Sequence, residues 1–359
     1  MKIEITPLDT LFFKDAKAFN MEDETWADSF FPPYPSVLYG ALRTVYFANH
    51  VDELDKATTK QDPTRNLVIK NISYNINGDI YYPLPKSIVK LKGSKEQFIK
   101  LTPKKNKFVS SQLLINSFCR SNLHSENIEN GCIMKSSLAN FLKCNIKEKD
   151  GILKNLTIST FDKYIKIENK IGIAIDKNKN SIKKENLYRI NMLRLEDMKI
   201  NIEFEGIDIP SEGFIKIGGE GKSLYYEEIE ETLSCNPNKE ETNKVLLYLS
   251  TPSIFKNGWL PSWIDKETLK GKYEKDGIKV KLQLITACLG KVQYVGGYDI
   301  KNKSPKPMGK AVPAGSVYYF EIEEGSKNDI IQLFHNKSIS EENTCKEGFG
   351  IVYVGSWEE

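Results

Sequence analysis

Three histidines are the side chains best suited to acid–base chemistry near pH 7, and they lie far apart in the sequence, at His50, His124 and His335. No HxxH, HExxH or GxSxG pattern surrounds them, and no local carboxylate pattern is typical of a metal nuclease. Separated residues can still meet in a folded chain. The sequence itself favours binding over catalysis and predicts neither a metal ion nor a cofactor.

Glycines and lysines offer a different chemistry, the binding of phosphate groups. The stretch IKIGGEGKS, residues 215–223, follows a strand pattern but lacks the GxxxxGK[ST] order of a nucleotide-binding loop. We expect a turn in which Gly218, Gly219 and Gly221 let backbone N–H groups approach a phosphate or a neighbouring chain, with Lys222 supplying charge. A simple tight turn is the alternative.

A second pair of glycines, Gly348 and Gly350, stands just before the last predicted strand. These glycines flank Phe349, whose ring could stack on a base or pack in a core. The pair is therefore a second candidate for backbone contact with RNA.

A proline-stiffened loop in residues 296–321 carries several lysines, among them Lys306 and Lys310. A stiff cationic loop holds a phosphate backbone at a lower ordering cost than a flexible one. We expect both lysines to contact RNA, although the same loop could instead cover the edge of a sheet.

Charge is distributed unevenly along the chain. The net charge of +3, from 51 Lys and Arg against 48 Asp and Glu, does not by itself indicate a nucleic-acid binder. Residues 86–107 contain eight Lys and one Glu, and residues 163–194 contain seven Lys and two Arg against three acids. Lys177 and Arg189 in the second cluster are candidate RNA contacts, with a solvated face as the alternative. Since only five cations are Arg, Arg43 indicates a place where bidentate donation is needed.

The cysteines show no CxxC spacing and no histidine partner at the spacing of a zinc site. Their scatter suits free thiols in a reducing compartment better than a disulfide framework. The first residues, MKIEITPLD, lack the apolar segment of a signal peptide, and no apolar run is long enough to cross a bilayer. We therefore expect a soluble, cytoplasmic protein.

A rigid approach to a helix is predicted in FFPPYPSVLYGALR, residues 30–43. The prolines favour an extended chain, and Ser36 is placed to cap the helix that follows. An apolar stripe predicts that this helix packs on a sheet, with members Leu38, Ala41, Leu42, Val45 and Ala48. Arg43 and Phe47 lie opposite the stripe, and Gly40 suggests the close approach of another backbone.

Alternating and apolar patterns predict many strands and few helices. Strands are expected at residues 2–6, 67–72, 79–82, 164–167, 171–175, 188–195, 200–204, 213–217, 244–250, 280–287, 291–295, 316–322 and 350–354, and helices after residue 36 and at residues 136–143 and 329–334. Residues 164–195 resemble a long hairpin with a basic tip. The acidic residues 220–241 are expected to form an exposed surface or a linker. We predict an α+β fold with antiparallel sheets and a boundary near residue 240, which gives domains 1–240 and 241–359.

Five stretches, taken in order, carry a family resemblance. They are PLDTLFFKDAKAF (7–19), FPPYPSVLYGALR (31–43), the GGEG turn, GYDIKNKSPKPMGKAVPAGSVYYFE (297–321) and EGFGIVYVG (347–355). Together they resemble the RAMP subunit that caps the crRNA 5′ end in the type III-B CRISPR effector, the Cmr complex. The resemblance implies two ferredoxin-like, RRM-related domains with insertions and no nuclease activity. It also implies that the protein holds the repeat-derived 5′ handle in antiviral defence, and bridges the large polymerase-like subunit to the backbone RAMP subunits.

The resemblance further implies where RNA binds. The loop with Lys14 and Asp15, and Arg43 on the first helix, should face the handle or a neighbouring subunit. Residues 218–222 correspond to the glycine-rich loop that RAMP proteins place against RNA. The proline-rich stretch would then orient the first helix so that Arg43 meets its partner.

Two other functions stay open. A metal-independent repeat RNA endonuclease on the same fold could use His50, at the expected end of the first helix, or a Tyr–Lys set. A purely protein-bridging subunit would make no RNA contacts and would show no salt-dependent RNA binding.

Overall fold

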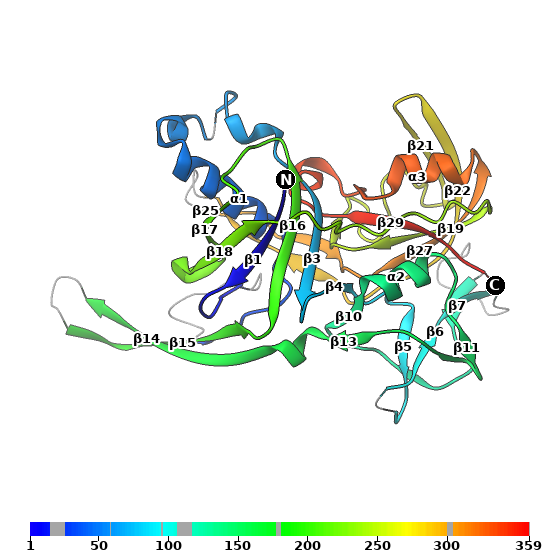
Figure 1. Ribbon diagram of the computed structural model, residues 1–359, viewed down its shortest axis with the longest axis horizontal. Helices are drawn as coiled ribbons and strands as arrows, with labels where there is room; N and C mark the ends of the chain where they lie inside the picture. Colours follow the sequence, from blue (N-terminus) through cyan, green and yellow to red (C-terminus); the bar gives the residue numbers. More distant parts are fainter. Residues whose placement is uncertain are drawn as a thin grey trace.

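Two large sheets organise the computed structural model (Figure 1), which describes residues 1–14, 26–57, 59–94, 96–105, 117–176, 181–299 and 304–358. The first sheet has the order β13-β10-β4-β3-β16-β1-β18-β17. Its strands are β1 (Lys2–Pro7), β3 (Val68–Ile76), β4 (Asp79–Pro83), β10 (Gly131–Met134), β13 (Ile158–Thr160), β16 (Met198–Glu205), β17 (Glu212–Lys216) and β18 (Ser223–Glu228).

The second sheet is built from the second half of the chain in the order β21-β22-β27-β19-β29-β28. Its strands are β19 (Lys244–Leu249), β21 (Lys270–Lys275), β22 (Ile278–Cys288), β27 (Val317–Glu324), β28 (Lys337–Ser338) and β29 (Ile351–Ser356). Both large sheets are antiparallel throughout their described pairings. The α-helices of the described residues are α1 (Pro35–Asn49), α2 (Lys135–Leu142) and α3 (Lys327–Phe334). The expected strand-rich α+β fold with antiparallel sheets is confirmed.

Smaller elements decorate the two sheets. The hairpin of β14 (Ile165–Asp176) and β15 (Ser181–Leu195) extends away from the first sheet in Figure 1, and β15 also pairs with β2 (Trp26–Ala27). A three-stranded sheet joins β20 (Ser253–Ile254), β26 (Gly309–Val312) and β23 (Gln293–Val295). The remaining short strands are β5 (Ile88–Leu91), β6 (Phe98–Lys100), β7 (Thr102–Lys105), β8 (Ser117–Arg120), β9 (Ser125–Glu126), β11 (Glu148–Lys149), β12 (Ile152–Leu153), β24 (Tyr298–Asp299) and β25 (Ser304–Pro305).

Helix α1 begins two residues earlier than its sequence indicates. Pro35 is the first helical residue, where its fixed φ suits a helix and its missing N–H costs no hydrogen bond. Tyr34 is therefore the N-cap, and it makes no side-chain capping bond. The prediction that Ser36 caps the helix is wrong, because the proline before it already starts the helix.

The buried face of α1 also differs at its C-terminal end. Leu38, Ala41, Leu42 and Val45 are buried against the first sheet as predicted, whereas Ala48 is exposed. Two further expectations fail: Phe47 is buried, and a Cβ at Gly40 would meet no atom within 4 Å. Four of the five residues of the predicted stripe are thus buried.

Residues 229–243 link the two sheets and expose their acids, as the acidic composition suggested, but part of this linker is buried. Leu233 and Cys235 are buried, and the carbonyl of Leu233 accepts a hydrogen bond from the Tyr82 hydroxyl (2.6 Å). Just before them, β18 alternates buried and exposed side chains and fills the place between β1 and β17. The two glutamates at the end of β18, Glu227 and Glu228, are both exposed.

The two sheets share a core that is sealed by buried tyrosines. Asn71 of β3 donates from Nδ2 to the hydroxyls of Tyr82 (3.1 Å) and Tyr353 (2.5 Å), and the rings of these tyrosines meet edge to face at 5.7 Å. Tyr248 of β19 donates across the same boundary to the carbonyl of Pro83. The hydroxyls of Tyr353 and Tyr248 thus join one sheet to the other.

His335, which follows α3, also lies at this boundary. Its Nε2–H donates to the carbonyl of Cys235 (2.8 Å), and its Nδ1 accepts from the N–H of Val354 (3.2 Å). Burial lowers the pKa of His335 below its ordinary value of 6.5.

We expect the free energy of unfolding to fall as the pH drops below about 6.5, because the unfolded chain then binds a proton that the folded imidazole resists. Urea unfolding followed between pH 8 and pH 5 measures this loss, and His335→Asn should remove part of the pH dependence. The matched control is His124→Asn, since His124 is exposed. Equal pH profiles for the wild type and His335→Asn would contradict the assignment.

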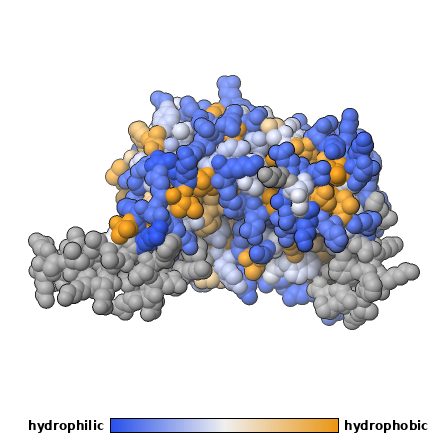
Figure 2. All heavy atoms as spheres, turned by 90° about the horizontal axis from the view of Figure 1, so that it is seen from below, coloured by the Kyte–Doolittle hydropathy of each residue, from blue (hydrophilic) through white to orange (hydrophobic). Residues whose placement is uncertain are grey.

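The surface is largely polar. The face shown in Figure 2 is mostly hydrophilic, with separate hydrophobic groups between the charged side chains. None of the helices in the described part of the chain is long and apolar enough to cross a membrane.

Candidate nucleic-acid interface

The glycine-rich stretch is the turn that joins β17 to β18. Gly218 has φ +78° and ψ −165°, a conformation open to glycine alone, and a Cβ there would lie 2.5 Å from the carbonyl oxygen of Phe12. The N–H of Gly219 donates to that same oxygen (2.8 Å). The missing side chains thus let the turn approach Phe12 and Phe13, which follow β1 and are buried.

The outer side of the turn is open. Gly221 has φ +61°, and a Cβ at this position would meet no atom within 4 Å. Lys222 forms an ion pair with Asp9, and this hydrogen bond is the largest cause that lowers the pKa of Asp9 to about 2. Lys222 is therefore held by an acid of its own chain, next to a turn whose backbone faces solvent.

Further ion pairs attach the turn to the long hairpin. Lys170 of β14 contacts the carboxylate of Glu220 (2.6 Å). Arg194 of β15 holds Glu168 through both Nε and Nη2, and its Nη2 lies 3.9 Å from Asp9. The hairpin base, the turn and the segment after β1 are thus joined by alternating charges. Lys170, Lys222 and Arg194 already have acidic partners. The exposed backbone of the turn is therefore the group best suited to receive a phosphate.

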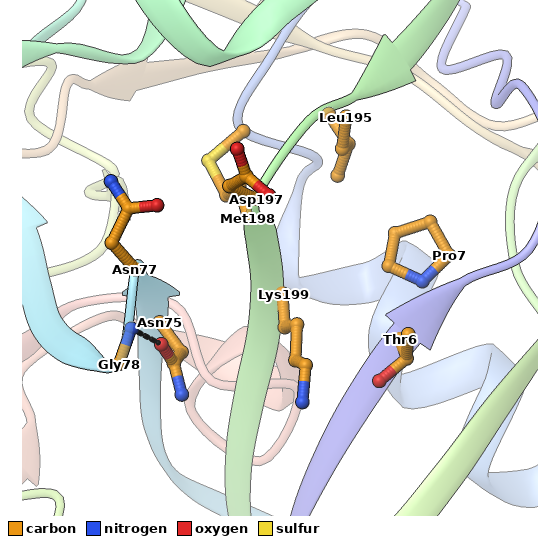
Figure 3. A pocket seen from close by; sticks show the side chains of 9 residues that line it. All are labelled: Thr6, Pro7, Asn75, Asn77, Gly78, Leu195, Asp197, Met198 and Lys199. Atoms are coloured by element: carbon orange, nitrogen blue, oxygen red, sulfur yellow. Dashed lines mark hydrogen bonds between the residues drawn. The ribbon is translucent and has the colours of Figure 1, made fainter.

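A polar hollow of about 400 Å³ lies at the end of β1, between the β3–β4 and β15–β16 turns (Figure 3). It is lined by Thr6, Pro7, Asn75, Asn77, Gly78, Leu195, Asp197, Met198 and Lys199. Lys199 and Asn75 both contact the carboxylate of Glu4, at 2.5 Å each. The hollow offers hydrogen-bonding groups beside the glycine-rich turn, because Pro7 pairs with Leu224 of β18.

Arg43 lies on α1 and is engaged within the chain. Its Nε donates to Oγ1 of Thr64 (2.8 Å), and its Nη2 donates to the carbonyl of Ala57 (2.6 Å) and to the carboxylate of Asp62 (2.7 Å). The guanidinium also lies 5.9 Å from the ring centre of Phe47. It shapes the segment after α1 while its side chain stays 31% exposed, and contact of Arg43 with RNA or a neighbouring subunit stays a prediction.

Arg43→Ala should lower the free energy of unfolding by about 1–2 kcal/mol, because three hydrogen bonds of a partly exposed guanidinium are lost. Arg43→Lys should lose part of the same stability, since an ammonium cannot reproduce the fork. Urea midpoints measure both changes, with the exposed Arg65→Ala as the control. Unchanged stability of Arg43→Ala combined with weaker RNA binding would instead support the prediction that Arg43 faces RNA.

Gly348 and Gly350 face the interior of the protein. A Cβ at Gly348 would lie 2.9 Å from Ile69, and one at Gly350 would lie 2.5 Å from the backbone nitrogen of Ser340. Phe349 between them is 1% exposed. These glycines permit close packing between segments of the chain, and Phe349 packs in a core, which is one of the two roles that the sequence left open. Contact of Gly348 and Gly350 with RNA stays a prediction.

The remaining predicted cations are spread over several surfaces. Lys14 is exposed and its backbone pairs with Ser29, close in the chain to Phe12 and Phe13, which support the turn. Arg189 is partly buried in β15, and Lys177 lies outside the described residues. Lys14 thus directly follows the two residues, Phe12 and Phe13, that contact the glycine-rich turn.

Lys306 and Lys310 belong to another part of the surface, and both are exposed. Burial raises the pKa of the Glu347 carboxyl, while the charges of Lys306 and Arg43 oppose that change. Lys306 therefore lies near Arg43 and Glu347. Lys310 belongs to β26 and borders an apolar groove.

The histidines occupy three separate elements. His50 ends α1, where its ring stacks on Tyr46 with the ring centres 4.3 Å apart and its Nδ1 contacts the Tyr46 carbonyl (3.0 Å). His124 is exposed beside β9, and His335 is buried between the sheets. Within the described ranges, no group of three or more His, Cys, Asp or Glu residues could hold a metal ion.

Residues 3–357 match the family model described as CRISPR-associated protein (Cas_Cmr3). The chain belongs to this family. The expectation that it resembles a subunit of the type III-B Cmr complex is thereby confirmed at the level of the family. The comparison with curated proteins gave no match.

Solved structures similar to this Cas_Cmr3 family member include chains of two cryo-EM structures. One is the type III-B Cmr-beta bound to cognate target RNA and AMPPnP, with a TM-score of 0.52 and 18% identity over 89% of this chain and 86% of that chain. The other is the type III-B Cmr-beta bound to cognate target RNA, with a TM-score of 0.52 and 18% identity over 93% and 88% of the two chains. This likeness shows a shared fold.

Sequence reasoning missed several residues that position the candidate interface of this Cas_Cmr3 family chain. Asp9, Glu168 and Arg194 fix the turn to the hairpin, yet each forms an ion pair with a residue in another element. Two sequence signals pointed to them: Asp9 lies in PLDTLFF, a stretch that carries the family resemblance, and Arg194 is one of only five arginines, whose scarcity indicated bidentate donation.

Proposed function

We propose that this protein is a non-catalytic RNA-binding subunit of a cytoplasmic type III-B Cmr effector. In this role it caps the repeat-derived 5′ handle of the crRNA and bridges the large polymerase-like subunit to the backbone RAMP subunits, in antiviral defence. The family match along residues 3–357 supports this role, as does a fold shared with chains of Cmr-beta complexes bound to RNA. We further propose that residues 1–240 and 241–359 form two ferredoxin-like units.

The geometric observation that supports the RNA-binding role is the exposed turn at residues 218–221, in which three of the four residues are glycine and the carboxylate of Glu220 is paired with Lys170. Its inner side is fixed by the hydrogen bond from Gly219 to Phe12, and its outer side has open space at Gly221. A backbone held in this way can receive a phosphate without first being ordered, which lowers the cost of binding. The ammonium of Lys222 adds favourable charge when RNA competes with Asp9 for it.

Gly221→Asn tests this proposal, because asparagine tolerates a positive φ and the space above Gly221 is open. In the assembled complex, we expect about tenfold weaker binding of handle RNA, or about 1.4 kcal/mol, with unchanged folding. Filter binding at several salt concentrations measures both affinity and its salt dependence.

The exposed Gly277→Asn, in the β21–β22 turn with φ +79° and open space around it, is the matched control. Wild-type affinity in Gly221→Asn would remove the turn from the interface. An assembled complex whose RNA binding shows no salt dependence would instead support the purely protein-bridging role.

The endonuclease alternative rests on the surroundings of His50. Its ring is stacked on Tyr46, whose hydroxyl donates to Glu53 (2.7 Å), and Lys56 also contacts Glu53 (3.2 Å). That hydrogen bond to Glu53 is the largest cause that raises the pKa of Tyr46 above its ordinary value. Incubating the protein with repeat RNA in EDTA separates the two functions, because cleavage that is lost in His50→Ala would favour the enzyme.

A further inference from the structure

A small sheet in the second half of the chain presents one face to solvent. In the sheet of β20, β26 and β23, Ile254, Ala311 and Val295 pack with the buried Phe349. Side chains alternate along a strand, so the neighbouring positions point away from this cluster. They include Tyr294 and Lys310, which are directly paired, and Met308 just before β26; Tyr294 is 47% exposed and Met308 is 55% exposed.

An apolar groove of about 200 Å³ adjoins this face. Its lining includes Trp259, Leu289, Val292, Val312 and Pro313. Leu289 is 37% exposed and Val292 is 51% exposed, although both are aliphatic. Solvent-exposed aliphatic groups that line a concave surface mark a place where a partner can exclude water.

The groove is already formed in the isolated chain. The ring of Trp259 stacks on Tyr318 with the centres 6.4 Å apart, and its carbonyl accepts the Tyr318 hydroxyl (2.5 Å). Gly290 also lines the groove, and a Cβ there would lie 2.7 Å from Cγ of Pro313. Glycine at this position therefore keeps the groove open, and binding requires little rearrangement.

The rim of the groove is mainly cationic. Lys310 lines it, and the neighbouring Lys291 has a side chain that is 94% exposed. The ammonium of Lys291 lies 3.5 Å from Glu129, but both groups are highly exposed. Such an ion pair contributes little to the stability of the fold. The stem of Lys86 passes beside Gly290, where a Cβ would lie 3.1 Å from its Cε. An occupant with negative charge around an apolar centre complements this rim.

The chemistry of the lining favours a protein over RNA. A base binds best to a flat aromatic face, whereas this groove is lined largely by aliphatic groups, and Trp259 already uses one face of its ring on Tyr318. An apolar centre with a charged rim is the usual arrangement of a protein–protein interface. Lys310, which the sequence assigned to RNA, is then part of that rim.

We infer that this groove docks a partner subunit of the effector, which inserts one apolar side chain from an acidic segment. The inference rests on the proposed function, because it takes the protein to be part of a multi-subunit complex. It adds the chemistry of the partner and the surface that receives it. The groove lies on the second half of the chain, whereas the glycine-rich turn belongs to the first sheet.

The test uses the full chain and labelled, overlapping 15-residue peptides that cover the other subunits of the complex. Fluorescence anisotropy should identify bound peptides that carry acids around one apolar residue. Val292→Asp should weaken their binding by at least about tenfold, because it places a charge in the apolar centre. Lys310→Glu should also weaken binding and reduce its salt dependence.

Val51→Asp is the matched control, since Val51 is 68% exposed and lies in a short helix, η1 (Val51–Lys56), after α1. The inference is overturned if no peptide binds, or if Val292→Asp and Val51→Asp bind peptides equally. It is also overturned if a labelled single-stranded RNA of 15 nucleotides binds and is lost in Val292→Asp while no peptide binds.

Handle RNA binding by the assembled wild-type complex is measured in parallel. If the wild type fails to bind the handle, the capping function falls whatever the peptides do. If the handle binds but the peptides do not, only the docking groove falls.

Discussion

Gly218→Ala should both destabilise the protein and abolish handle binding. The alanine would place a Cβ 2.5 Å from the carbonyl oxygen of Phe12 and 3.1 Å from the ring of Phe13, in a backbone conformation that alanine rarely adopts. Strain of this kind costs about 1–3 kcal/mol, and the turn must also move away from the segment that holds it. Urea unfolding measures the stability, and filter binding with the assembled complex measures the loss of RNA affinity.

Gly277→Ala is the matched control, because Gly277 has nearly the same φ of +79° but open space around it. The difference between the two alanine variants removes the cost of a positive φ and leaves two costs at Gly218, the contact with Phe12 and the ψ of −165°. Equal stability in both variants would show that the contact between the turn and Phe12 does not contribute to the free energy of unfolding. Retained RNA affinity in Gly218→Ala would separate the turn from the capping role.

Tyr353→Ala should have the largest effect on stability. Tyr353 is fully buried in β29, where it accepts a hydrogen bond from Asn71 of the first sheet and packs edge to face on Tyr82. Its ring also meets His335 and Tyr248. Removing a large buried ring costs about 3–5 kcal/mol, because a cavity stays behind in a shared core.

The comparison with Tyr353→Phe divides this effect. Phenylalanine keeps the ring and removes one hydroxyl, so we expect a loss of about 1 kcal/mol. Chemical denaturation followed by fluorescence and by circular dichroism should show one coincident transition for both variants, since the core lies between the two sheets. Two separate transitions, or equal losses for Ala and Phe, would contradict this account.

Local patterns in the sequence predicted most of the fold. The alternation in residues 2–6 and the apolar run in residues 244–250 appear as β1 and β19, and residues 164–195 form the expected hairpin. Strand β18 was missed because its glutamates dominated the composition, although its first four residues, SLYY, bury every second side chain. A period of two is thus a better guide to a strand than charge content.

The candidate interface could be predicted only in part. The glycines of the turn were visible because only glycine adopts such backbone conformations at no cost. The contacts of that turn could not be predicted from the sequence, because Asp9 and Lys222 form an ion pair although they lie far apart along the chain. Arg43 and Gly348 were assigned to RNA from their residue types, whereas their partners, Asp62 and Ile69, are set by packing that a local pattern does not encode.

The segment between β18 and β19 limits how this protein can be rearranged by recombination. Its buried side chains, Leu233 and Cys235, fill the space between the two sheets, and the carbonyl of Cys235 binds a histidine that follows α3. A crossover near residue 240 would therefore join two halves whose facing surfaces had not evolved together. Exchange between relatives should succeed only when both halves and the segment between them are transferred as one unit.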